Sequence, residues 1–86
     1  MAQPFQQQPQ IKTRMSVLVF LKGSAAPLVL YVDKPLELYE EMLSYLKMPA
    51  NIKLVEKDTV GPIKKVAFMS NQIAGAALQE EQYYVQ

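Results

Sequence analysis

Carboxylates and amines are the side chains of this chain with the most chemical potential, because its 86 residues include neither histidine nor cysteine. Histidine and cysteine supply most groups that titrate near neutral pH, most thiol nucleophiles and most zinc ligands. The four serines have no histidine partner and lie outside any nucleophile-elbow motif. The same composition excludes disulfides. We therefore predict that the protein is not an enzyme.

Three glutamates, Glu37, Glu40 and Glu41, form the densest group of carboxylates. Such a group could hold a metal ion, but no second carboxylate group lies at a spacing that would complete an oxygen cage. Charged residues three and four positions apart are common on the solvated side of an amphipathic helix. The Gly61-Pro62 turn is too poor in glycine for a phosphate-binding loop. The sequence therefore predicts no catalytic residue, no metal site and no cofactor.

The basic residues allow two interpretations. Net charge is only +1, from nine Lys or Arg against eight Asp or Glu, whereas nucleic-acid-binding proteins usually have a clear basic excess. Lysines in or beside strands often serve to prevent edge-to-edge aggregation. The alternative is a single-stranded nucleic acid on an open sheet face, with Phe20 and Tyr31 stacking on bases. Its candidate contacts are Arg14, Lys22, Lys64 and Lys65.

The stretch from Pro35 to Lys47 carries the clearest secondary-structure signal. Its apolar residues recur at helical spacing, and proline suits the first helical position. Lys34 precedes this proline and is predicted to be the N-cap residue. We expect one apolar stripe of the helix to face the core and its glutamates to face water. The stripe consists of Leu36, Tyr39, Leu43 and Leu46, with Met42 beside it.

Runs of β-forming residues lie on both sides of this helix. Residues 14–22 and 28–32 are joined by a short link that contains glycine and proline, which predicts an antiparallel hairpin. Residues 51–57 and 63–69 predict a second pair of strands, separated by the loop at Gly61-Pro62.

The stretch from Ser70 to Gln79 fits either a helix or a strand. Its alanine, leucine and glutamine residues favour a helix, whereas Gly75 and a poorly focused apolar face disfavour one. We favour a polar turn at residues 70–72 followed by a short strand over residues 73–78. This strand would form a tight hairpin with the preceding one.

These elements predict an α+β fold in which a small antiparallel sheet packs on one amphipathic helix. The predicted order is β-β-α-β-β, with the strand at residues 73–78 as a fifth. Residues 1–10 are rich in glutamine and proline and are expected to form a disordered tail. Residues 11–82 are expected to form a single domain, and residues 83–86 a frayed C-terminus, although Tyr83, Tyr84 and Val85 would also fit an edge strand.

Apolar side chains on both faces of the first two predicted strands are the main indication of function. One thirteen-residue helix covers only one face of a sheet, and the sequence does not decide which face that is. An exposed apolar patch usually marks a protein–protein interface, and a second copy of the chain offers a matching surface. We therefore predict a small interaction or adaptor module that self-associates through its sheet or binds another protein. The candidate interface residues are Leu18, Phe20, Val29 and Tyr31.

The N-terminal residues MAQPFQQQPQ lack the apolar core of a signal peptide. The longest apolar runs, residues 17–21 and 28–32, are far shorter than the ~20 residues that span a bilayer. We therefore expect a soluble, cytoplasmic protein with no membrane partner.

Overall fold

A computed structural model describes residues 10–85 of the chain. The elements alternate as predicted, with two strands, one helix and three further strands. In chain order they are β1 (Gln10–Leu21), β2 (Leu28–Leu30), α1 (Pro35–Lys47), β3 (Leu54–Asp58), β4 (Lys65–Met69), the 3-10 turn η1 (Ser70–Gln72) and β5 (Ile73–Val85).

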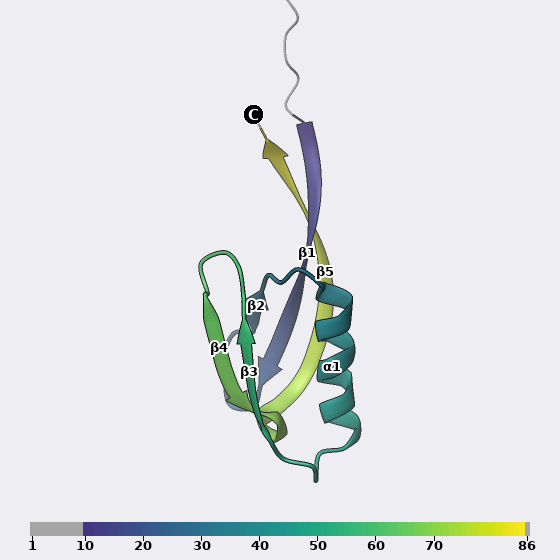
Figure 1. The fold of residues 1–86 in the computed structure, drawn as a ribbon, viewed down its shortest axis with the longest axis vertical. Helices are drawn as coiled ribbons and strands as arrows, with labels where there is room; N and C mark the ends of the chain where they lie inside the picture. Colours follow the sequence, from purple (N-terminus) through teal and green to yellow (C-terminus); the bar gives the residue numbers. More distant parts are fainter. Residues whose placement is uncertain (1–9, 86) are drawn as a thin grey trace, which may run out of the picture.

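The strands form two antiparallel sheets rather than one. The larger sheet has the order β2-β1-β5, and β3 pairs with β4 in a separate hairpin. The helix α1 and the β3–β4 hairpin lie side by side over one face of the larger sheet (Figure 1). The α+β class and the helix packed on a small antiparallel sheet are therefore confirmed.

The core lies between these two layers. Val17, Val19 and Leu30 come from one face of the larger sheet and are fully buried. Leu38 and Met42 of α1 pack against them, and Val55 of β3 and Phe68 of β4 complete the cluster together with Ile73. Side chains alternate between the two faces of a strand, so this cluster identifies the covered face of the sheet.

The bounds of α1 match the predicted helix, and Lys34 is its N-cap residue, but only part of the predicted core face lies in the core. The buried residues are Leu38 and Met42, whereas Leu36 is 55% exposed and Leu43 only half-buried. Tyr39 and Leu46 reach the edge of the core. Apolar residues occupy about half of the helix circumference, so two different apolar stripes could have faced the core. The stripe that meets Val17 and Ile73 is the one that the fold buries.

β1 and β5 are longer than predicted because they pair with each other along almost their whole length. The register runs from Gln10 opposite Val85 to Phe20 opposite Gly75. Residues 83–85, placed by the sequence in a frayed end, therefore belong to β5. Of the predicted tail, residues 1–9 lie outside the described residues and Gln10 is the first residue of β1.

Residues 70–79 adopt the favoured alternative of a polar turn followed by a strand. The turn is η1, and β5 begins at Ile73. The predicted hairpin with the preceding strand was wrong, because β5 pairs with β1 instead of β4. The turn lets the chain leave one sheet and enter the other: the Ser70 amide bonds to the Lys53 carbonyl, and the Lys22 amide bonds to the Gln72 carbonyl.

Glu41 joins the helix to the β3–β4 hairpin, although the sequence placed it on the solvent side. Its carboxylate lies 2.6 Å from the Lys57 ammonium and accepts a hydrogen bond from the Tyr45 hydroxyl. Burial by itself would raise the pKa of Glu41, but Lys57 and Tyr45, with the charge of Lys53, outweigh it and lower that pKa below 4.5. Burial and the bond to Glu41 raise the pKa of Tyr45 to about 12.

Met42→Ala should destabilise the protein far more than Leu43→Ala. Truncating a buried methionine costs about 2–5 kcal/mol, a large part of the ~5 kcal/mol expected for so small a domain. Leu43 lies outside the buried cluster, so its truncation removes less packing. Urea denaturation of both variants checks this difference. Equal losses of unfolding free energy would contradict the orientation of α1.

Glu41→Gln should lower the melting temperature at neutral pH and lose this effect in acid. The pKa of Glu41 is depressed in the folded state, so its contribution is present above about pH 4.5 and is lost as the pH falls through the folded-state pKa. Thermal melts across that range measure the gap from the wild type. Glu37→Gln is the matched control, because Glu37 is exposed and lies 4.0 Å from Lys34. A gap for Glu41→Gln that persists in acid would contradict this role.

Candidate interaction surface

The second face of the larger sheet is not covered by any segment within residues 10–85. Leu18 lies opposite both Val29 of β2 and Ala77 of β5, and Phe20 lies opposite Gly75. These residues alternate with the buried Val17 and Val19, so they share the uncovered face. The helix therefore covers the face of Val17, Val19 and Leu30, which answers the question that the sequence left open.

Leu18, Phe20 and Val29 form an apolar patch on this uncovered face. Phe20 is 40% exposed, and Leu18 and Val29 are half-buried by their neighbours in the sheet. Phe20 leans toward Gly75: a Cβ atom at Gly75 would lie 3.8 Å from the Phe20 Cδ2 atom. Because residue 75 is glycine and residue 77 is alanine, no large side chain of β5 covers the Phe20 ring.

Tyr31, the fourth predicted interface residue, belongs to a polar cluster around Glu81. The Glu81 carboxylate accepts hydrogen bonds from the Tyr31 hydroxyl at 3.1 Å and from Arg14 Nε at 3.0 Å. Gln79 Nε2 and Ser16 Oγ donate to the same carboxylate at 3.0 and 3.4 Å. The Arg14 guanidinium also lies over the Tyr31 ring, 4.3 Å from its centre. These contacts hold β5, β1 and the residue after β2 together.

The sequence did not identify Ser16, Gln79 and Glu81 as members of one cluster. They meet only because Ser16 lies opposite Gln79 and Arg14 opposite Glu81. The sequence offers one signal for this cluster: Gln79 and Glu81 are two residues apart, as are Arg14 and Ser16, so each pair can share one face of its strand. That signal has meaning only once β1 and β5 are known to be partners.

The four candidate nucleic-acid contacts do not come together. Arg14 is engaged with Glu81 on β1, and Lys22 follows the other end of that strand. Lys64 and Lys65 lie on the β3–β4 hairpin, in the second sheet. The structure therefore forms no shared basic surface from these four residues.

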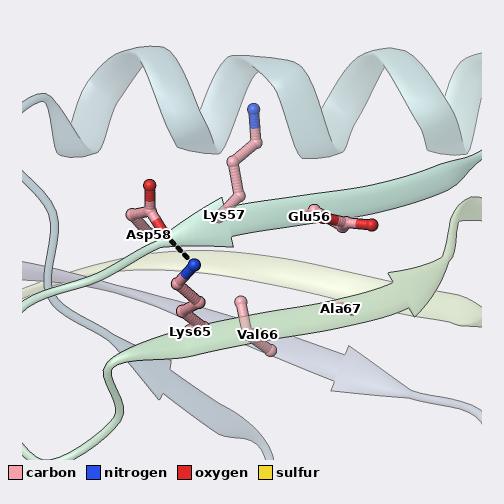
Figure 2. A pocket seen from close by; sticks show the side chains of 6 residues that line it. All are labelled: Glu56, Lys57, Asp58, Lys65, Val66 and Ala67. Atoms are coloured by element: carbon pink, nitrogen blue, oxygen red, sulfur yellow. Dashed lines mark ion pairs between the residues drawn. The ribbon is translucent and has the colours of Figure 1, made fainter.

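A shallow hollow of about 400 Å³ lies over the β3–β4 hairpin (Figure 2). Lys57 points from it toward the helix, where it pairs with Glu41. Lys65 and Asp58 face each other across its rim at 3.8 Å, and both side chains are 85% exposed. Its charged groups are therefore either engaged or solvated, and none of them is arranged to bind a ligand.

Within residues 10–85 no group of three or more acidic, histidine or cysteine side chains is placed to hold a metal ion. In the same part of the chain, no helix has the length and apolar character needed to cross a membrane.

Comparison with known proteins adds no relative. No protein-family model matches this chain, and no curated protein and no solved structure matches it either.

Proposed function

We propose that this chain is a small, non-enzymatic interaction module that self-associates through its three-stranded sheet. The observation that carries the proposal is the one-sided burial of that sheet. Val17, Val19 and Leu30 are fully buried under the helix and the hairpin, while the opposite face presents Leu18, Phe20 and Val29. A sheet that has apolar residues on both faces but is packed against other elements on only one face is typical of a subunit of an oligomer.

A second copy is the partner that the composition favours. The net charge of +1 gives no general attraction to an oppositely charged partner. A two-fold contact places identical surfaces against each other, so an apolar patch meets an apolar patch with no further chain needed. Removing such surface from water is favourable by about 25 cal/mol per Å².

Phe20→Lys should weaken self-association while leaving the fold intact. The side chain is 40% exposed, so a lysine at this position can reach water in the isolated subunit. In the assembly the same lysine would bring charge to the apolar patch. Analytical ultracentrifugation measures the shift from dimer to monomer, and circular dichroism checks the fold.

Leu54→Lys is the matched control, because Leu54 is an exposed apolar residue on the other sheet. This variant should sediment like the wild type. A wild-type protein that stays monomeric at tens of micromolar or above would refute self-association. Dimers that form equally well with Phe20→Lys would remove Phe20 from the interface.

A further inference from the structure

β5 has an outer edge with no partner among the described residues. It lies at the end of the β2-β1-β5 order, and no backbone hydrogen bond joins its outer side to another part of residues 10–85. An edge strand of thirteen residues presents a long row of unpaired backbone donors and acceptors, which is a template for another strand.

The edges at β2 and β4 carry features that block such pairing, whereas β5 carries only two glutamates and a bulge at Ala74 near its start. β2 has only three residues, follows Pro27, and is succeeded by Tyr31, which bridges to Val60. β4 begins at Lys65 directly after Lys64. In contrast, β5 contains no proline, lysine or arginine. Short strands, prolines, bulges and charges, above all lysines, are the usual protections of an edge, so the long β5 edge is the least protected of the three.

The helix α1 also has apolar side chains that lie outside the buried core. The flank of α1 toward β3 holds Glu41, bound to Lys57, and Tyr45, whose ring lies 5.0 Å from the Lys53 ammonium. The helical period places Leu36 and Leu43 on the flank of α1 turned away from Glu41. The helix itself lies along β5, on the side of the molecule away from β4 (Figure 1). We call Leu36 and Leu43 the helix flank.

The paired ends of β1 and β5 extend beyond the rest of the fold as a two-stranded arm (Figure 1). The arm consists of Gln10–Met15 paired with Glu80–Val85, and β2 begins to pair only at Val17. Ile11 and Tyr84 lie opposite each other on the arm and are 59% and 72% exposed. A two-stranded ribbon with apolar side chains in water is only marginally stable, so the arm needs a surface to pack on.

We propose that two copies of the chain pair their β5 edges antiparallel about a two-fold axis at Gln79. The two sheets then form one six-stranded sheet, in the order β2-β1-β5 followed by its symmetric copy. This inference rests on the proposed self-association and adds an edge contact to it: Phe20 enters this contact, whereas Leu18 and Val29 remain on the uncovered face.

A bulge at Ala74 shifts the β1–β5 register, because Phe20 lies opposite Gly75 but Leu21 opposite Ile73. With the axis at Gln79, Gly75 lies opposite the partner's Tyr83, so the residues from Gly75 to Tyr83 pair without interruption. An axis nearer the start of β5 would pair fewer residues of this regular stretch.

The side chains of β5 fit this register. Glu80 lies opposite the partner's Leu78 and Glu81 opposite the partner's Ala77, so no glutamate faces a glutamate. An axis at residue 80 or 81 would instead bring two identical carboxylates together. Tyr83 lies opposite the partner's Gly75, where its ring would meet the Phe20 side chain that leans over that glycine. An aromatic residue across from an edge glycine is a known stabilising pair.

The same register gives the arm a surface to pack on. In this register the arm of each copy would lie beside the first half of the partner's β5, which is the half that α1 covers within one chain (Figure 1). Tyr84 projects on the helix side of the sheet, like Ala76 and Leu78, and therefore faces the partner's helix flank. The most exposed aromatic side chain of the arm and the leucines of the helix flank thus cover each other.

The size of the contact requires this arm-to-helix packing. The paired stretch from Gly75 to Tyr83 is about 30 Å long and a sheet layer about 10 Å thick, so the edge alone presents roughly 300 Å². A stable interface buries about 800 Å² per partner. Backbone pairing therefore supplies less than half of the area, and the arm and the helix flank supply the remainder.

Single cysteines test the axis directly, because the chain has no other thiol. Residues opposite each other across paired strands have Cβ atoms about 4.5–5.5 Å apart, close enough for a disulfide after a small shift. Under a mild oxidant, Gln79→Cys in the full chain should become mainly disulfide-linked dimer. Ala77→Cys, which lies opposite the partner's Glu81, should not. Ala67→Cys on the exposed face of the β3–β4 hairpin is the control for random collisions.

Tyr83→Ser provides a second readout that needs no cysteine. Loss of the contact with Phe20 and Gly75 of the partner subunit should weaken dimerisation about three- to tenfold in sedimentation equilibrium. A wild-type monomer would refute the proposed function together with this geometry. A wild-type dimer in which Ala77→Cys cross-links and Gln79→Cys does not would overturn the register. A dimer in which neither residue cross-links would overturn edge pairing and leave self-association standing.

Discussion

The pairing of β1 with β5 is the constraint on which the rest of the structure depends. It joins the first and the last described segments of the chain, from Gln10 opposite Val85 to Phe20 opposite Gly75. β2 is too short to hold β1 alone, and the β3–β4 hairpin belongs to another sheet. The covered and uncovered faces of the larger sheet therefore exist only because these two strands meet in this register.

The register also decides what each side chain does. Val17 and Val19 point into the core, whereas Ser16, Leu18 and Phe20 point to the uncovered face. A shift by one residue would exchange the two sets and bury the polar partners of Glu81. The Glu81 cluster opposes such a shift, because its carboxylate receives donors from β1, β5 and Tyr31 in this alignment alone.

Local signals in the sequence were enough to place the helix and to favour a strand after the 70–72 turn. Proline at the first helical position and apolar residues at helical spacing are properties of neighbouring residues, so Pro35–Lys47 could be predicted to the residue. The orientation of that helix could not, because the stripe through Leu38 and Met42 and the stripe through Leu36 and Leu43 are both apolar. Only the shape of the surface beneath the helix separates them.

The pairing of strands that are distant in the sequence could not be predicted from local signals either. Residues 73–78 follow β4 after a tight turn, which is the usual mark of a hairpin, yet η1 directs them to β1. The Glu81 cluster and the extension of β5 to Val85 both follow from that choice of partner. Leu18, Phe20 and Val29 could still be placed on one face, because alternation along a strand needs no knowledge of its partner.

Contact between the two ends of the described chain also constrains the order of folding during synthesis. Among the described strands a ribosome releases β1 first and β5 last, so β1 meets its main partner only after α1 and the β3–β4 hairpin have been made. Until then α1 and the β3–β4 hairpin can form from local contacts, but Val17 and Val19 have only the short β2 beside them. Pairing across such a separation is slow, because the loop must close before its contacts contribute. Each newly made chain therefore passes through a period in which the apolar half of β1 is open to other chains.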